Sequence, residues 1–564
     1  MRLLHFLLVI LFVLRLSPPA AAEPSFWDET DDEMLVETLL GRMSQEEKLA
    51  QLLLIGWPTA EPTPELLRWI RERNLGGVKV FGWNGGNVFT LASAVTEMQE
   101  AARVGPHQIP LFTATDQEGG WVRHVKGATT ITPGNMAIGA SGLPYDSYKS
   151  AYYIARELRT LGINMNFAPT VDVYTNPEAH VIGPRAFSDN AAQVALLGLA
   201  YFHGMEENRV IATAKHFPGH GNASGDSHGV LPVLSETEAD LWDHDLVPYR
   251  LLIRENLPAI LSGHLSFPNI IDPDTPASLS HHFKTEMLRN RMGFRGIVIT
   301  DDLYMHGALR YAQAHNLSFA ELCVEAVRAG NDMIMLSRTP GFNGEVWQAL
   351  MAAYSSEPSF RRRVEESVRR ILRVKIRYLK PENRVPLAPD PAKVAQMLPD
   401  PDGRTYFLEQ AARSVTLIAD GAIPFQPAPS ERVLLAGADG DFLREGRRRY
   451  PDADTLRLQT RDFRSVSNRD LERLRAAGRS YDAIIFCLSG PETLSLLVSL
   501  ENAAAEVLVF SILTPVYLSE VPWVESAIAV YGWGVESFQA GFSVLSGDFD
   551  ADGSLPVQLG DPLQ

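Results

Sequence analysis

Short runs of apolar residues recur along the chain from about residue 50 onward, and amphipathic stretches separate most of them. Eight runs precede residue 340: Gln51–Trp57, Gly77–Phe81, Pro110–Thr115, Ile163–Pro169, Val210–Ala214, Ala259–Ser262, Gly296–Thr300 and Asp332–Leu336. Such runs are typical of buried strands, and strands that alternate with helices indicate a parallel sheet. Eight units of this kind predict a (β/α)8 TIM-type barrel, with a doubly wound sheet as the alternative.

Polar side chains follow five of these runs: Asp116 and Glu118, Asp172, Lys215 and His216, His264, and Asp301 and Asp302. In a (β/α)8 barrel the carboxyl ends of the strands share one face, and that face carries the active site. Polar residues also begin ordinary loops, but this explains one or two of the cases rather than five. The distribution therefore favours the barrel over the doubly wound sheet.

The pattern changes after the charged stretch Glu357–Leu379, which we predict to be the helix that closes a barrel domain over residues 23–379. Residues 380–401 contain six prolines, and this density predicts a linker, which we place at residues 380–404. Six more apolar runs then alternate with helical patterns. They predict a three-layer α/β domain over residues 405–564: Ser414–Ala419, Val433–Ala436, Asp454–Leu458, Ala483–Leu488, Val507–Ile512 and Ala527–Tyr531.

Residues 1–22 have the layout of a secretory signal peptide. Arg2 supplies a positive charge, Leu3–Leu14 is almost wholly apolar, and small residues precede Glu23. A membrane anchor is the alternative, but an apolar run of 12 residues falls short of the roughly 20 that a membrane-spanning helix needs. We therefore predict cleavage after Ala22 and an exported protein, periplasmic or secreted, without a membrane span.

Composition and charge narrow the class of protein and of partner. The 564 residues are 45% hydrophobic and 21% charged, which is ordinary for a globular protein. The formal net charge is −17 at pH 7, and an acidic chain repels phosphate backbones, so nucleic acid is not expected as a partner. The two cysteines, Cys323 and Cys487, exclude a disulfide-rich scaffold and a Cys-based zinc cluster.

The densest group of reactive side chains lies in residues 215–229, with the sequence KHFPGHGNASGDSHG. The segment follows a predicted strand, so we expect it at the mouth of the barrel. A metal site is one interpretation, because His216 and His220 are four residues apart. Pro218 and Gly219 lie between them and forbid a regular helix, and no H-E-x-x-H pattern is present, so we expect no metal.

Two pairs of residues can carry proton transfer or nucleophilic attack. Asp226 and His228 are two positions apart, so the carboxylate can hold one imidazole nitrogen while the other acts as acid or base near neutral pH. Asp301 and Asp302 end a predicted strand, where only one of them can face the barrel axis. Helix N-capping explains Asp302, whereas an acid such as Asp301 at the end of an apolar run should be paired or functional.

Two further segments complete the candidate site. Residues 114–121 (ATDQEGGW) and 181–187 (VIGPRAF) offer an acid and an arginine suited to sugar hydroxyls and an acyl oxygen. Trp83 and Trp121 can stack on a pyranose face. Each of these features alone is more often structural.

In order and spacing, these motifs resemble glycoside hydrolase family 3, and within it the β-N-acetylhexosaminidase branch. The resemblance runs from about Gln45 to the C-terminus and rests on five segments: Asp116–Gly120, Val181–Phe187, Lys215–Gly221, Asp226–His228 and Thr300–Leu303. It implies a barrel followed by an α/β domain, without a metal or organic cofactor. It implies that Asp301 is the nucleophile and His228 the acid/base, assisted by Asp226. The residues that it implies for holding a terminal N-acetylglucosamine are Asp116, Arg185, Lys215 and His216.

The chain departs from the family pattern in one motif. The family usually continues Asp-Gln-Glu as Gly-Gly-Arg-Val-x-Arg, whereas here Trp121 and His124 replace the two arginines and Arg123 lies one position early. The planar fork of an arginine is hard to replace, so a sugar-binding group is lost or displaced. We expect Arg123 or His124 to compensate in part.

The resemblance implies a retaining exo-β-N-acetylhexosaminidase that acts on cell-wall muropeptides, as in peptidoglycan turnover, or on chitin fragments. Two alternatives stay open: a β-N-acetylglucosaminide phosphorylase that uses the same site, and a non-catalytic cell-wall binding protein. A β-glucosidase fits less well, because that branch typically takes its acid/base from a glutamate outside the 215–229 loop. The second domain has no comparable cluster, with Glu492 and Glu536 as its candidate acids. The oligomeric state is not indicated.

Overall fold

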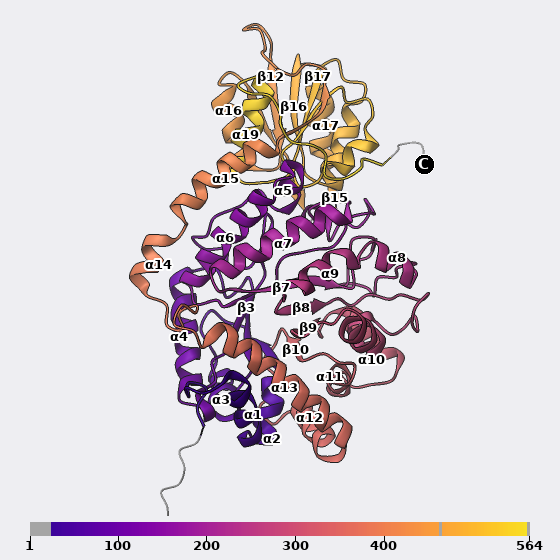
Figure 1. Cartoon of the computed structure of the whole chain (residues 1–564). Helices are drawn as coiled ribbons and strands as arrows, with labels where there is room; N and C mark the ends of the chain where they lie inside the picture. The colour runs from indigo at the N-terminus through magenta and orange to yellow at the C-terminus, as the bar shows by residue number, and fades with distance from the viewer. Residues whose placement is uncertain (1–23, 462–464, 561–564) are drawn as a thin grey trace, which may run out of the picture.

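The computed structural model describes residues 24–461 and 465–560, so the expected signal peptide lies outside the described residues. The chain forms a barrel domain and a second α/β domain that sits above it in Figure 1, with the helices α14 (Pro391–Met397) and α15 (Pro401–Ser414) running between them along one side. In the part of the chain that the structure describes, no helix combines the length and the apolar character needed to cross a membrane.

Eight parallel strands close into one barrel, as the alternation of apolar runs predicts. In order around the barrel they are β1 (Leu53–Gly56), β10 (Met333–Leu336), β9 (Ile297–Asp302), β8 (Ala259–Ser262), β7 (Ile211–Phe217), β6 (Met165–Asn166), β3 (Phe112–Thr115) and β2 (Gly77–Val80). The strands are almost wholly buried, because helices cover their outer faces. The (β/α)8 fold is therefore confirmed, and the doubly wound sheet is excluded.

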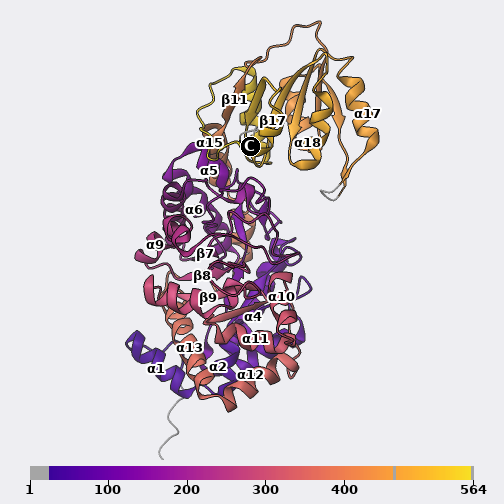
Figure 2. The ribbon, with the colours of Figure 1, turned by 90° about the vertical axis from the view of Figure 1, so that its right-hand side faces the viewer.

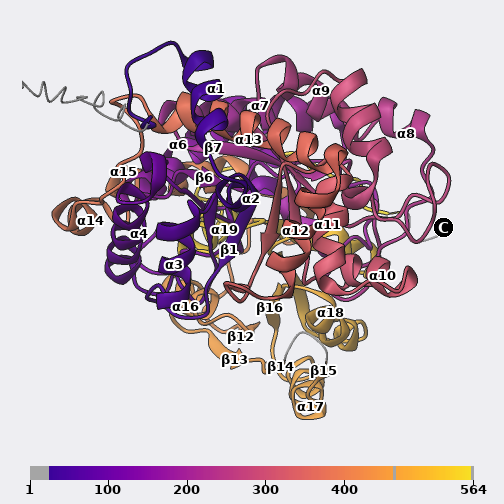
Figure 3. The same cartoon turned by 90° about the horizontal axis from the view of Figure 1, so that it is seen from below.

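Helices surround the barrel strands, as the view from below in Figure 3 shows. They include α3 (Pro64–Arg73), α4 (Val88–Arg103), α6 (Pro144–Thr160), α7 (Ala191–Glu207), α9 (Leu246–Arg254), α10 (His306–Ala314), α11 (Phe319–Arg328), α12 (Glu345–Ser356) and α13 (Pro358–Leu379). Side-chain caps fix several of their starts. Ser318 and Glu321 form a reciprocal capping box at α11, and Asn190 accepts two backbone N–H bonds at α7. Helix starts that are fixed in this way hold the preceding loops over the barrel.

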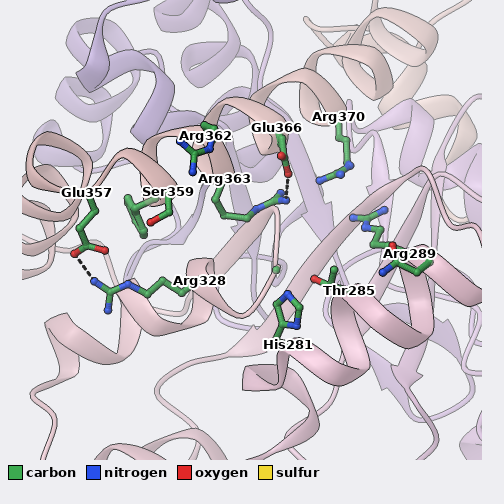
Figure 4. A pocket seen from close by; sticks show the side chains of 13 residues that line it. His281, Thr285, Arg289, Arg328, Glu357, Ser359, Arg362, Arg363, Glu366 and Arg370 are labelled. Carbon is green, nitrogen blue, oxygen red and sulfur yellow. Dashed lines mark hydrogen bonds and ion pairs between the residues drawn. The ribbon is translucent and has the colours of Figure 1, made fainter.

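A buried carboxylate at the amino end of β10 fixes the closing helix α13. Asp332 accepts hydrogen bonds from Arg289 at 2.5 Å, from Arg363 at 2.6 Å and from Arg370 at 3.0 Å. Arg289 belongs to the π-helix His282–Arg291, and the other two arginines belong to α13. Figure 4 shows the three arginines beside a hollow, with Arg363 also paired to Glu366. The amino ends of the strands lie opposite the face that carries function, so this network is structural.

The second domain contains a six-stranded sheet covered on both faces. Its strand order is β11 (Thr416–Asp420), β18 (Ser526–Ala529), β17 (Glu506–Ser511), β16 (Ala483–Leu488), β12 (Val433–Gly437) and β13 (Asp454–Arg457), with β11 antiparallel to its neighbour. Leu434 and Ile484 pack with α17 (Asn468–Ala477) and α18 (Pro491–Leu497), whereas Leu435 packs with α16 (Gly440–Arg449) and α19 (Val535–Ser546). Figure 2 shows α17 and α18 on one side of the sheet. This is the predicted three-layer arrangement.

The proline-rich segment 380–404 contains helix as well as irregular chain. Both α14 and α15 begin at a proline, which suits the first position of a helix because its missing N–H has no partner there. Asp400 caps α15 and pairs with Arg156 of α6 at 2.5 and 2.7 Å. The segment is thereby tied to the barrel.

The end of the second domain returns to the barrel and contacts the loop before α7. The Ser188 hydroxyl donates to the Pro556 carbonyl at 2.7 Å, and the Asp189 carboxylate accepts the Gln558 N–H at 2.7 Å. This is the loop that carries Arg185, so residues more than 360 positions apart in sequence fix its shape.

Candidate active site

The carboxyl ends of the barrel strands open into a cavity of about 490 Å³. Eight of the nine residues singled out in the sequence line it: Asp116, His124, Arg185, Lys215, His216, Asp226, His228 and Asp301. The ninth, Arg123, is not among the lining residues. Neither of the candidate acids of the second domain, Glu492 and Glu536, lines the cavity either.

Asp116, which follows β3, lies between two ammonium groups. The Nζ of Lys215 is 2.6 Å from its Oδ1, and the Nζ of Lys79 on β2 is 2.7 Å from its Oδ2. Burial alone would raise the pKa of Asp116, but the two ammonium groups outweigh it and hold the pKa well below its ordinary value. Asp116 is therefore an ionised hydrogen-bond acceptor at the cavity wall.

Glu118, on β4 (Gln117–Gly119), orients the other cations of the wall. Arg185 donates two hydrogen bonds to its carboxylate, at 2.9 and 2.8 Å, and the Nζ of Lys215 lies 2.5 Å from Oε1. Burial opposes ionisation, yet Arg185 and Lys215 lower the pKa of Glu118 to about 2. The sequence marked Glu118 only as a polar residue at a strand end. Its partner Arg185 lies 67 positions away, so local patterning could not reveal the pairing.

His216 is held in one tautomer by its two neighbours. Its Nδ1 lies 2.7 Å from the buried Asp172 carboxylate, and its Nε2 lies 3.1 Å from Nη2 of Arg185. A guanidinium can only donate, so Nε2 accepts and Nδ1 carries the proton that bonds Asp172. Asp172 also accepts the backbone N–H groups of His216 and His220, at 3.1 and 2.8 Å. In the described ranges no group of three His, Cys, Asp or Glu side chains could hold a metal ion.

Asp301 lies near the end of β9, which is diametrically opposite β3 in the strand order of the barrel. Its Oδ1 accepts the backbone N–H of Asp302 at 2.8 Å. Burial would raise the pKa of Asp301, but nearby imidazoles, first that of His264, lower it below the ordinary value. Asp301 is therefore ionised at neutral pH, and it lines the same cavity as Asp116 from the opposite side of the barrel.

The N-capping interpretation of Asp302 is wrong. Helix α10 begins at His306 with Met305 at its N-cap. The Asp302 carboxylate instead accepts the backbone N–H groups of Ser337 at 3.0 Å and Tyr304 at 3.3 Å. Its hydrogen bond to Ser337 joins the ends of β9 and β10, a long-range contact that the local sequence does not encode.

The expected hydrogen bond between Asp226 and His228 is present. The Nδ1 of His228 lies 2.7 Å from Oδ1 of Asp226, which also accepts the backbone N–H of His228 at 2.9 Å. This hydrogen bond raises the pKa of His228 above its ordinary value and lowers the pKa of Asp226 to about 2. Nδ1 is occupied by the carboxylate, so Nε2 is the nitrogen available for proton transfer. The side chains are 69% and 53% exposed, so the pair lies at the outer edge of the cavity.

Arg123 and His124, the two residues expected to compensate for the missing arginines, lie in different places. His124 lines the cavity, with Nδ1 3.1 Å from Nζ of Lys79, and burial together with that ammonium lowers the pKa of His124 to about 4. Arg123 instead donates to the carbonyl and hydroxyl oxygens of Thr129, both at 3.2 Å. The second positive charge beside Asp116, in addition to that of Lys215, therefore comes from Lys79. The sequence did contain a signal for it, a single lysine inside the apolar run Gly77–Phe81.

Comparisons with known proteins identify relatives of this chain. Residues 44–374 match the model of the family described as glycosyl hydrolase family 3 N terminal domain. Beta-hexosaminidase A of Pseudoalteromonas piscicida is 32% identical over 387 residues, which cover 64% of this chain and 62% of that protein. A beta-N-acetylglucosaminidase/beta-glucosidase of Cellulomonas fimi is 30% identical over 414 residues, which cover 71% of this chain and 69% of that protein. The first match thus spans less than two thirds of the relative's own length.

A solved structure has the same two-domain extent. It is a glycoside hydrolase family 3 beta-N-acetylglucosaminidase from Paenibacillus sp. str. FPU-7, 27% identical in sequence, with a TM-score of 0.78. The superposition covers 92% of this chain and 99% of that one. The similarity therefore includes the second domain as well as the barrel.

Proposed function

Because this chain belongs to glycoside hydrolase family 3, we propose that it is a retaining exo-β-N-acetylhexosaminidase that removes terminal β-linked N-acetylglucosamine from oligosaccharides. One observation carries the proposal. A partly buried, ionised Asp301 and the imidazole of His228, which the Asp226 carboxylate holds, border the same cavity. The names of the two relatives and of the solved structure support the choice of sugar.

The terminal sugar binds against the charged wall of the cavity, which consists of Asp116, Glu118, Arg185 and Lys215. The ionised Asp116 accepts hydrogen bonds from sugar hydroxyls, and Lys215 and Arg185 donate to sugar oxygens. Glu118 and Asp172 hold these donors and His216 in place before the substrate arrives, so little ordering is needed on binding.

In the first step the Asp301 carboxylate attacks the anomeric carbon and the glycosidic C–O bond breaks. Nε2 of the protonated His228 gives its proton to the departing oxygen, so the aglycone leaves as an alcohol. Asp226 stabilises the imidazolium beforehand and keeps the ring oriented, as a carboxylate does for the histidine of a serine protease. The product of this step is a glycosyl-enzyme ester at Asp301.

In the second step the neutral His228 takes a proton from a water molecule as the water oxygen attacks the same carbon. The ester bond to Asp301 breaks and the free sugar leaves with its original configuration. The carboxylate and the imidazolium are regenerated together. Two displacements at one carbon therefore give net retention.

The configuration of the first-formed product tests this mechanism. NMR of chitobiose hydrolysis should show the β-anomer before mutarotation, and the α-anomer appearing first would contradict the role of Asp301. The same reaction with inorganic phosphate separates hydrolysis from phosphorolysis, since a phosphorylase forms N-acetylglucosamine 1-phosphate. Failure to cleave any N-acetylglucosaminide would favour a binding protein.

We also propose that the protein is exported, on the basis of the layout of residues 1–22. Mass spectrometry of the N-terminal peptide from the periplasm or the medium tests this. The expected mature chain begins at Glu23, and recovery of the intact N-terminus from the cytoplasm would contradict export.

A further inference from the structure

The outer part of the cavity carries two exposed indoles. Trp83 and Trp121 both line the cavity and are 54% and 38% exposed, whereas the charged wall beneath them is almost wholly buried. Trp83 follows β2, and Trp121 lies between β4 and β5 (Val122–Arg123), directly after β3. Since β2 and β3 are neighbours in the barrel, the two indoles come from adjacent loops.

The ring of Trp83 is fixed in the absence of substrate. It stacks on Phe81 with ring centroids 4.6 Å apart and an angle of 8° between the planes. Its indole N–H donates to the Trp57 carbonyl at 2.7 Å. A ring held in this way loses little freedom when a ligand covers its exposed surface.

The lysines and the arginine that line this cavity are already engaged in ion pairs. The lysine and arginine side chains among the lining residues are almost wholly buried, and each is paired with Asp116 or Glu118: Lys79, Lys215 and Arg185.

The histidines add little free positive charge at the rim. Burial lowers the pKa of both His124 and His220 to about 4, so both are neutral near pH 7. The remaining exposed imidazole, that of His228, is held by the Asp226 carboxylate. A negatively charged ligand group at the rim would therefore find no unpaired cation among the lining residues.

We propose, on the basis of the proposed function above, that Trp83 and Trp121 form the subsite for the sugar on the leaving side of the scissile bond. This subsite takes a neutral N-acetylglucosamine unit, as in chitin oligosaccharides, in preference to N-acetylmuramic acid. The apolar C–H face of a pyranose ring stacks on an indole. The lactyl carboxylate of a muramic acid unit would lose hydration without gaining a cation, and the net charge of −17 adds long-range repulsion.

The experiment compares three substrates that share the same terminal sugar. Chitotriose places a neutral sugar in the subsite, the disaccharide N-acetylglucosaminyl-β-1,4-N-acetylmuramic acid places an acidic one, and β-N-acetylglucosaminyl fluoride places none. We expect the wild-type protein to have a higher kcat/KM on chitotriose than on the acidic disaccharide. Trp83→Ala and Trp121→Ala should each raise KM for chitotriose roughly 3- to 10-fold and leave turnover of the fluoride unchanged.

Two variants make the test sharper. Trp533→Ala is the matched control, because Trp533 is also 38% exposed but lies in the second domain and does not line the cavity. It should leave all three substrates unaffected. Trp121→Arg introduces a cation at the rim, and it should increase kcat/KM on the acidic disaccharide relative to chitotriose.

The outcomes separate this proposal from the proposed function. If a Trp→Ala variant loses turnover of the fluoride, the substitution has damaged the inner site, and the conservative Trp→Phe variant is measured instead. If this phenylalanine variant does not return KM for chitotriose toward the wild-type value, the proposed subsite is wrong. A wild-type protein that prefers the acidic disaccharide overturns the choice of ligand. A wild-type protein that cleaves none of the three overturns the proposed function itself.

A lysine outside the lining residues supplies one more check. Lys126 lies beside Gly82, one residue before Trp83. If Lys126→Ala selectively lowers kcat/KM on the acidic disaccharide, a cation does serve the subsite and the proposed preference is wrong. Equal small effects on chitotriose and the acidic disaccharide support the proposal.

Discussion

The ammonium of Lys79 and the carboxylate of Asp116 form an ion pair of 2.7 Å between neighbouring strands of the barrel. The Lys79 side chain is completely buried, and a buried ammonium is costly unless a carboxylate lies beside it. The positive charge of Lys79 therefore reaches the cavity from a strand rather than from the loop that follows β3.

Replacing Lys79 by methionine should weaken substrate binding more than it slows chemistry. Loss of a charge-assisted hydrogen bond is worth about 1.5–3 kcal/mol, so KM for chitobiose should rise roughly 10- to 100-fold while kcat changes little. The ammonium of Lys79 also contributes to the low pKa of His124, so its removal should raise that pKa, which NMR titration of the imidazole measures.

The double variant Lys79→Met with His124→Arg is the control for this prediction. An arginine at position 124 would return a cation to the side of Asp116 from which Lys79 was removed, because Nδ1 of His124 lies 3.5 Å from Oδ2 of Asp116. Partial recovery of KM would show that the charge matters rather than the lysine itself. An unchanged KM in the single variant would remove Lys79 from the binding wall.

Asp301 and Asp302 are adjacent carboxylates with different expected roles. Asp301→Asn should lower kcat by at least roughly a thousandfold, because an amide cannot form the glycosyl-enzyme ester. Asp302→Asn keeps an oxygen that can accept from Ser337 and should cost far less. Steady-state rates with folding checked by circular dichroism measure both. Similar losses in the two variants would argue against Asp301 as the sole nucleophile.

The proposed acid/base pair of His228 and Asp226 is tested with two substrates, one whose leaving group needs a proton to depart and one whose leaving group does not. His228→Ala should lower turnover of chitobiose by about 10²- to 10⁴-fold. It should largely spare the glycosylation step for a dinitrophenyl glycoside, whose leaving group departs without a proton. Asp226→Asn should show the same pattern more weakly. Equal losses on both substrates would indicate a role in binding or folding.

The pH dependence of kcat/KM gives a second measurement of the same pair. Asp226 raises the pKa of His228 by stabilising the imidazolium, so protonated His228 persists to a higher pH than a free imidazole would. The basic limb of the profile should therefore move to lower pH in Asp226→Asn. A limb that stays in place would mean that another group is titrating.

The network at the opposite end of the barrel should govern stability rather than catalysis. Asp332→Asn leaves three arginines without their shared buried carboxylate and should cost about 3–5 kcal/mol in the free energy of unfolding. Urea denaturation measures this, and kcat/KM of the folded variant should stay close to that of the wild type. Glu366→Gln is the matched control, since Glu366 pairs with Arg363 at the surface and should cost less than about 1 kcal/mol.

Much of the architecture could be predicted because the local sequence of each strand is sufficient to indicate it. Every one of the eight apolar runs before residue 340 overlaps a barrel strand, although β7 and β9 extend two to three residues beyond their runs. Polar groups at the ends of the runs converge on one cavity. Strands of a parallel barrel are buried on both faces, so they appear in sequence as mostly apolar segments rather than as alternating ones. That signal needs no knowledge of distant contacts.

The parts that could not be predicted depend on partners far away in sequence. Lys79 interrupts an apolar run, and only the fold reveals that Asp116 neutralises it. Arg123 faces Thr129 instead of the cavity because of the β4–β5 hairpin, whose register no periodicity specifies. The Asp302 carboxylate finds Ser337 on the next strand rather than a helix start. For Lys79 and Asp302 a long-range contact overrides the local interpretation, and for Arg123 the conformation of the hairpin does so.

The contact between Ser188 and Pro556 has a consequence for the biosynthesis of the protein. The barrel strands and the acid/base loop are complete well before residue 556 is made, yet the loop that presents Arg185 is fixed by that residue and by Gln558. While the chain emerges from the ribosome, the loop that presents Arg185 therefore lacks both contacts until residues 556 and 558 have been translated. Newly made protein should acquire full affinity for its sugar only after these two residues have reached the barrel.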